Sequence, residues 1–115
     1  MKLPNAERAV IRIEKLRDYC LSSEHKKGAH KARVFRAALD LSAHDAERLR
    51  GMLLDGLVES EVVASRSIGF GILYTVDIDV SHGGRAARVR TAWLIETSEV
   101  IPRLVSCYVK QEAEP

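Results

Sequence analysis

The apolar residues of this 115-residue chain change their spacing near residue 60, and this change restricts the possible folds more than any other feature. Before it, apolar residues recur every three or four positions, which is the period of amphipathic helices. After it, apolar residues occupy every second position of residues 72–80, and all the positions between them except Leu73 are polar, which is the period of a strand with one buried face. Helices followed by strands, in a chain long enough for one core, predict a single α+β domain over residues 1–115.

The first half is expected to form about three helices within residues 13–58, after an extended lead-in over residues 1–12. The first two helices are expected at residues 13–22 and 30–40, and the third ends near residue 58. The third begins at a capping box, because Ser42 and Asp45 have the spacing that satisfies free backbone N–H groups at a helix start.

The second half is expected to form a meander of about four antiparallel strands within residues 61–109. The strands are expected at residues 61–66, 72–80, 86–95 and 102–109. The tripeptide His82-Gly83-Gly84 marks a tight turn, so the strands on either side should pair as a hairpin. We expect the helices to pack on one face of this sheet, and the tail at residues 110–115 to be frayed.

A basic stretch from His25 to Arg36, HKKGAHKARVFR, contains five of the eighteen Lys and Arg residues and no acid. Lys31 lies one turn before Phe35, at the edge of the apolar face of the second helix. Because burying an ammonium group is costly, a lysine at this position is a candidate for a functional site. The alternative is a solvated helix end, where the lysine stem covers apolar surface and the ammonium group reaches water.

The net charge of +2 divides unevenly along the chain. Residues 1–50 carry twelve Lys and Arg against seven acids, whereas residues 51–115 carry six against nine. A basic half suggests a polyanionic partner, although the overall balance does not require one. Cys20 and Cys107 have no metal-ligand spacing and are expected to be small core residues in a reducing compartment. With no apolar leader and no membrane-length segment, we expect a cytoplasmic protein without membrane contact.

The segment RVRTAW places Arg88 and Arg90 on one face of a predicted strand and Trp93 on the other. Two arginines on one sheet face require anions to pair with. The carboxylates of Asp77 and Asp79 on the neighbouring strand would supply them, and so would the phosphates of a ligand. Both alternatives stay open at this point. Trp93 is more typical of a core residue than of a base-stacking platform.

No metal and no cofactor are expected from the sequence. His25 and His30 are five residues apart, with no HExxH motif or Cys/His cluster and only Glu24 as a nearby carboxylate. No Gly-rich loop follows a strand and opens a helix, so a nucleotide cofactor is not indicated either.

Four segments in order, LRDYCLSSEH-x-x-G-x-HKARVFRAAL, YTVDIDV, RVRTAWLI and PRLVSCYV, resemble a small family of uncharacterised bacterial domains. Members of that family occur alone and as C-terminal modules of polymorphic toxins. These modules look like relatives of the barnase, EndoU, colicin and RelE class of metal-independent RNases, in which helices precede a four-stranded antiparallel meander. The resemblance covers about residues 3–108.

The resemblance implies a toxin-like endoribonuclease, in which the 2′-OH attacks the adjacent phosphorus without a metal. The implied catalytic residues are His25, His30, Lys31, Arg90 and Thr91. The implied substrate contacts are Lys26, Lys27, Arg88, Trp93, Ser106 and Tyr108. Either histidine would serve as base or acid, and the cations would stabilise the extra negative charge. Lys31 and Arg90 are expected to converge across the cleft between helices and sheet.

Three positions depart from the family pattern. Lys26 stands where a proline is usual, Ser106 stands at a threonine or glycine-like position, and Ala92 stands where the toxin modules often have glycine. Ser106 keeps a hydroxyl, whereas Ala92 narrows the space that a glycine would leave. The alternative function is a non-catalytic module that binds nucleic acid or protein, such as one partner of a toxin–antitoxin pair. The partners to consider are therefore RNA and a cognate antitoxin or immunity protein, and the sequence does not predict the oligomeric state.

Overall fold

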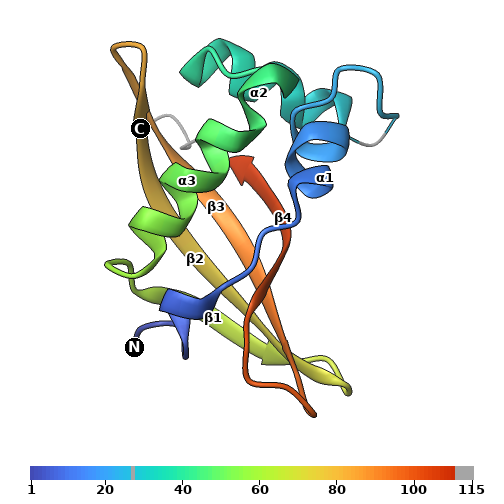
Figure 1. Cartoon of the computed structure of the whole chain (residues 1–115), viewed down its shortest axis with the longest axis vertical. Coiled ribbons are helices and arrows are strands. Elements are labelled where there is room, and N and C mark those ends of the chain that lie inside the picture. Colours follow the sequence, from blue (N-terminus) through green and yellow to red (C-terminus); the bar gives the residue numbers. More distant parts are fainter. Residues whose placement is uncertain (27, 111–115) are drawn as a thin grey trace, which may run out of the picture.

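A computed structural model of the chain describes residues 1–26 and 28–110. It confirms the α+β arrangement, with the helices on one face of a four-stranded antiparallel sheet (Figure 1). The helical elements are η1 (Ala6–Arg8), α1 (Ile13–Lys15), η2 (Leu16–Cys20), α2 (Ala29–Leu39), η3 (Ala43–Asp45) and α3 (Ala46–Leu57). The strands are β1 (Val62–Ser67), β2 (Gly71–His82), β3 (Arg85–Glu96) and β4 (Arg103–Val109). Lys27 and residues 111–115, which include most of the expected frayed tail, lie outside the described residues.

The sheet is a meander in the order β1-β2-β3-β4, so each strand pairs with its neighbour in sequence. The β2–β3 hairpin is the longest pairing, and it runs from Gly71 opposite Glu96 to His82 opposite Arg85. The turn predicted at His82-Gly83-Gly84 therefore closes this hairpin. β4 pairs with β3 on one side and forms an edge of the sheet, with a register shift between Ala92 and Trp93.

The three expected helices are present, and local features of the chain explain where they begin or end. The first is short, because α1 continues into the wider π-helical turn of η2, a feature often associated with functional sites. α2 ends at Asp40, which adopts a left-handed conformation with φ of 53°. η3 and α3 follow the predicted capping box, in which the Ser42 N–H donates to Asp45 Oδ2 at 3.0 Å. None of the helices within the described part of the chain is long and apolar enough to cross a bilayer.

The lead-in over residues 1–12 is extended for most of its length but contains one 3-10 turn, Ala6–Arg8. Asn5 permits this turn, because its φ of 55° is a left-handed conformation that asparagine tolerates. The lead-in also touches both edges of the sheet, since Lys2 bridges to Glu61 and Val10 bridges to Arg103. Through these bridges the lead-in connects the β4 edge of the sheet to the helical layer.

The hydrophobic core fills the space between the helices and one face of the sheet. The helices contribute the buried side chains of Phe35, Leu39, Leu49, Leu53 and Leu57, and the sheet contributes Val76, Ile78, Val80, Val89 and Trp93. Each such side chain stabilises the fold by roughly 1.5–3 kcal/mol on burial. Because successive strand residues point to opposite faces, Asp77, Asp79, Arg88 and Arg90 project from the face that the helices do not cover.

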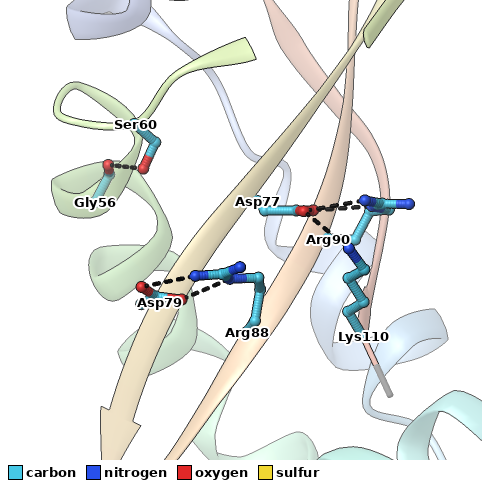
Figure 2. Close-up of polar contacts among 7 residues, drawn as sticks. All are labelled: Gly56, Ser60, Asp77, Asp79, Arg88, Arg90 and Lys110. Carbon is cyan, nitrogen blue, oxygen red and sulfur yellow. Dashed lines mark hydrogen bonds and ion pairs between the residues drawn. The ribbon is translucent and has the colours of Figure 1, made fainter. Parts of the chain in front are cut away.

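α3 packs tightly against β2 at Gly56. A Cβ atom at this position would stand 2.5 Å from Cγ2 of Ile78, so any larger residue would push α3 away from β2. Just beyond the helix, the Ser60 hydroxyl donates to the Gly56 carbonyl at 2.7 Å (Figure 2). This packing holds the β2–β3 hairpin, and with it the charged outer face of the sheet, at a fixed position relative to the helices.

Candidate functional site

Lys31 joins the basic helix to the edge of the sheet. Its ammonium group donates a hydrogen bond of 2.9 Å to Oγ of Ser106 on β4. The side chain is half-buried, which agrees with its expected place at the edge of the apolar face of α2. An ammonium group carries three donors, so two N–H groups remain available beyond the one directed at Ser106.

Two tyrosine rings lie beside this ammonium group. Nζ of Lys31 lies 5.1 Å from the ring centroid of Tyr19 and 5.7 Å from that of Tyr108. Both distances are within the range of cation–π attraction, so both rings attract the ammonium group. Tyr19 comes from the π turn η2 and Tyr108 from β4, so three elements hold the ammonium group in position.

His25 extends the site on the side of Tyr19. Its ring meets the Tyr19 ring edge to face, with centroids 4.6 Å apart. The backbone N–H of Gly28 donates to Nδ1 of His25 at 3.0 Å, which fixes the neutral ring as the tautomer with hydrogen on Nε2. Glycine is required at position 28, because a Cβ atom there would overlap the backbone carbonyl of Tyr19. The loop before α2 therefore presents His25 as a hydrogen-bond donor at Nε2.

Arg90 extends the site on the other side of Tyr108, on the outer face of the sheet. It binds the carboxylate of Asp77 through two hydrogen bonds, of 2.9 and 3.0 Å, and Lys110 lies 3.6 Å from the same carboxylate (Figure 2). Asp77 is well covered, with 9% of its side chain exposed. Two cations around one carboxylate leave an excess of one positive charge at this part of the sheet.

The hydrogen bonds of this cluster shift the titration of its members. The pKa of Asp77 is lowered mainly by the hydrogen bonds from Arg90, with Lys110 acting in the same direction. The pKa of Arg90 is raised by Asp77 and, to a smaller extent, by a hydrogen bond with Tyr108. Tyr108 thus touches the environments of both Lys31 and Arg90. Lys31 and Arg90 therefore both approach Tyr108, at the β4 edge of the sheet.

Arg88 pairs with Asp79 across the hairpin, which is the carboxylate alternative considered from the sequence. Its guanidinium donates to Asp79 at 2.9 and 3.4 Å (Figure 2). Both side chains are exposed, so this cross-strand pair is worth about 0.2–1 kcal/mol. Arg88 and Arg90 are therefore paired with the two aspartates of β2.

Thr91 and Trp93 lie on the opposite face, inside the core. Both are 0% exposed. The Thr91 hydroxyl donates to the Val76 carbonyl at 2.6 Å and accepts a hydrogen bond from Trp93 Nε1, also at 2.6 Å. These contacts satisfy the polar atoms of both side chains, so neither is available to a ligand in this conformation. They support the sheet beneath the site and are not among its surface groups.

The remaining basic residues surround the site at the surface. His30 and Lys26 are exposed, and Lys27 lies outside the described residues. His30 and Lys31, with Val34, Tyr108 and Val109, line a groove of about 390 Å³. A second groove, of about 350 Å³, lies beside His25 and Tyr19. Lys31 lines the first groove with His30, and Tyr19, whose ring lies beside the Lys31 ammonium group, lines the second with His25.

Cys20 and Cys107 lie together in the core near the site. Both are free and buried, as expected. A hydrogen bond with the Cys107 thiol lowers the pKa of Cys20, and the charge of Lys31 acts in the same direction. The same hydrogen bond and burial raise the pKa of Cys107. The sequence did not indicate this contact, because the two cysteines are far apart in the chain.

Two members of the site were missed by sequence reasoning, namely Tyr19 and Lys110, whereas Asp77 was anticipated as a partner for the arginines. The alternation of β4 could have identified Lys110, because it follows Ser106 and Tyr108 on the same face. Tyr19 carried no such signal, since only the fold places its ring beside Lys31. Within the described residues, no three His, Cys, Asp or Glu side chains are grouped as metal ligands would be.

The arrangement is suited to binding a phosphate-like anion. The ammonium group of Lys31 presents two uncommitted donors, and Arg90 and Lys110 add an excess positive charge close by. The rings of Tyr19 and Tyr108 reduce the access of water to Lys31, and the His25 ring packs against that of Tyr19. Hydrogen-bond donors held in place before an anion arrives cost no reorganisation when it binds, and this makes them effective.

Fold and site together define an α+β domain with a cationic site at the edge strand of its sheet. The chain belongs to the family described as a domain of unknown function, DUF6883, which matches residues 2–111. Its fold is similar to a solved contact-dependent growth inhibition toxin–immunity protein complex from Klebsiella pneumoniae 342. The TM-score is 0.61 at 10% sequence identity, and the alignment covers 93% of this chain and 97% of that chain. At this identity the similarity establishes the fold alone. No curated protein matches the chain.

Proposed function

We propose that this domain is a toxin-like, metal-independent endoribonuclease that acts on RNA in the cytoplasm. The observation that carries the proposal is the half-buried ammonium group of Lys31, which is held against Ser106 and between two tyrosine rings. The two adjacent grooves are each lined by a histidine, which supplies groups for proton transfer near neutral pH. The fold similarity to a toxin–immunity complex is consistent with this class of protein.

In the proposed reaction, the 2′-oxygen of a ribose bonds to the adjacent phosphorus and the bond from phosphorus to the 5′-oxygen breaks. His30 takes the proton of the 2′-OH, and the ammonium group of Lys31 gives a proton to the leaving 5′-oxygen. The excess charge at Arg90 and Lys110 stabilises the phosphorane, and His25 lines the groove beside Tyr19. The products carry a 2′,3′-cyclic phosphate and a 5′-hydroxyl.

The test is cleavage of a purified tRNA pool in excess EDTA. We expect discrete fragments with 2′,3′-cyclic phosphate ends, and a loss of about 100-fold or more in rate for Lys31→Ala. Lys2→Ala is the matched control. The Lys2 ammonium group also donates a hydrogen bond within the protein, at 2.8 Å to the Glu59 carbonyl, but it lies at the opposite edge of the sheet. If the RNA stays intact but is bound in a salt-sensitive manner, the ribonuclease proposal is wrong and the domain is a non-catalytic binding module.

A second candidate function is docking of a partner protein. Apolar side chains are exposed at the sheet end where the β1–β2 and β3–β4 turns meet, namely Phe70, Ile72 and Val100 at 60%, 42% and 58% exposure. The N–H of Thr97 donates to the Phe70 carbonyl at 3.0 Å and holds the two turns together. If this end binds a cognate partner, Phe70→Ser with Val100→Ser should abolish complex formation and leave the Tm nearly unchanged, as size-exclusion chromatography and thermal melts would show.

A further inference from the structure

A third groove, of about 790 Å³, lies between α2 and the ends of β3 and β4. Small apolar side chains form most of its surface: Val34, Ala37 and Ala38 from α2, Ala86 and Ala87 from β3, and Val109 from β4. Because the facing residues are alanines, helix and strands leave a slot that larger side chains would have filled. No aromatic side chain lines the slot within the described part of the chain.

The rim of this groove is cationic. Arg33, Arg88, Lys110 and His30 line it, and no acidic residue does among those described. The charge of Arg88 is balanced by Asp79 and that of Lys110 is shared with Asp77, but no ion pair involves Arg33 within the described residues. An occupant with a flat apolar body and a negative charge fits this combination of surfaces.

The groove also continues into the Lys31 site. His30, Val34 and Val109 line both this groove and the smaller groove that contains Lys31 and Tyr108. A polyanion whose phosphate is held at Lys31 would therefore place its next unit in the alanine-lined slot. In RNA, that next unit is a base with its own phosphate.

We propose that the groove between α2 and the β3–β4 ends binds the nucleotide next to the scissile phosphate, with its base on the alanine surface and its phosphate at Arg33. This inference rests on the proposed function. Guanidinium planes such as those of Arg33 and Arg88 also stack on bases, which suits a slot without aromatic rings. An acidic segment of a partner protein is the competing occupant, and the experiment separates the two.

The test uses the full chain with ¹³C-labelled alanine methyl groups, titrated with AMP, GMP, CMP and UMP and, separately, with inorganic phosphate. We expect the nucleotides to shift the methyl signals of Ala37, Ala38, Ala86 and Ala87, with Ala64 on β1 as the reference that does not move. Phosphate alone should leave all of them unmoved. Unmoved groove signals with nucleotides, or equal shifts with phosphate, would overturn the proposal. So would shifts produced only by an alternating Glu-Leu peptide, which would assign the groove to a protein.

A matched pair of variants completes the test. Ala86 and Ala64 are both exposed strand residues, so Ala86→Glu and Ala64→Glu introduce the same charge inside and outside the groove. Affinity for a 2′-O-methyl RNA pentamer, which cannot be cleaved by 2′-OH attack, should fall tenfold or more for Ala86→Glu, about 1.4 kcal/mol, and stay unchanged for Ala64→Glu.

The outcome is independent of whether the protein cleaves RNA. Nucleotide-induced shifts of the methyl signals without RNA cleavage would support nucleotide binding in the groove and overturn the proposed ribonuclease activity. Cleavage that is lost in Lys31→Ala but unaffected by Ala86→Glu, with unmoved methyl signals, would support the ribonuclease and overturn the groove.

Discussion

The ammonium group of Lys31 donates to the hydroxyl of Ser106 at 2.9 Å, although 75 residues separate the two in sequence. This contact makes α2 part of the candidate site, because it directs the positive charge of Lys31 to the edge strand β4. It also distinguishes between the two interpretations of Lys31 from the sequence, a functional site or a solvated helix end. The stem of the lysine covers apolar surface, as in a solvated helix end, but its ammonium group is held by specific partners.

Removing the partner hydroxyl should affect function more than stability. Ser106→Ala removes one hydrogen bond to a charged but half-buried group, so we expect it to lower the free energy of unfolding by about 0.5–1.5 kcal/mol. Because Lys31 is then less well oriented, RNA cleavage should fall about tenfold. Ser106→Thr keeps the hydroxyl and should retain most activity. Equal losses for both variants would show that the hydroxyl is not what matters.

Asp77 should be important for stability. Asp77→Asn removes the carboxylate that accepts two hydrogen bonds from Arg90 and neutralises part of the charge of Lys110. We expect a loss of about 1–3 kcal/mol in the free energy of unfolding, measured by urea denaturation. Asp79→Asn is the matched control, because its exposed pair with Arg88 contributes about 0.2–1 kcal/mol. A larger effect for Asp79→Asn would contradict the assignment.

The same carboxylate predicts part of the response to acid. The pKa of Asp77 is lower in the folded state than in the unfolded chain, so its contribution is complete above the usual carboxyl value, near pH 4. The contribution disappears as the pH falls through the lowered value, because the folded state must then accept a proton that breaks the pair. The unfolding free energy of Asp77→Asn should therefore fall less steeply below about pH 4 than that of the wild type. Parallel curves would mean that Asp77 titrates alike in both states.

The fold was largely predictable because each element carries its own periodicity. Residues 74–80 alternate apolar and polar side chains, and the Ser42–Asp45 capping box marks the start of the third helix, so both elements appear where expected. The 3-10 turn after Asn5 was not predictable, because it depends on one residue adopting a left-handed conformation. The links from the lead-in to Glu61 and Arg103 join distant parts of the chain, and no local pattern encodes them.

Gly28 should tolerate no side chain. A methyl group there would overlap the Tyr19 carbonyl, so Gly28→Ala must displace either the loop or η2, and we expect a loss of about 1–3 kcal/mol. Gly51→Ala is the control, because nothing lies within 4 Å of its Cβ position in α3. That change should stabilise the protein by about 0.5–1 kcal/mol through helix propensity. Thermal melts of the two variants should therefore shift in opposite directions.

The thiols of Cys20 and Cys107 should be protected in the folded protein. Both side chains are 0% exposed, so a reagent such as DTNB reaches them only when the protein opens. We expect slow modification of the native protein, and rapid titration of two thiols in guanidinium chloride. Rapid modification of either cysteine without denaturant would show that the η2–β4 contact opens readily.

The candidate site was only partly predictable. Lys31 could be identified, because a lysine at the edge of an apolar helical face is a local feature. Alternation separated Arg90 from Thr91 correctly, whereas Thr91 entered the set of site residues through the family resemblance, although its side chain is buried. The position of Tyr19 beside Lys31 depends on η2 packing against β4, which is a property of the assembled fold.

The position of Ser106 and Tyr108 in β4, the last strand, has a consequence for the order of events during synthesis. The helices and the first three strands leave the ribosome before the segment that completes the Lys31 environment. A nascent chain that has already formed its helices therefore still lacks the site. The contacts of Lys31 with Ser106 and Tyr108 therefore form only when translation of the domain is nearly finished, so the direction of synthesis sets when this arrangement is complete.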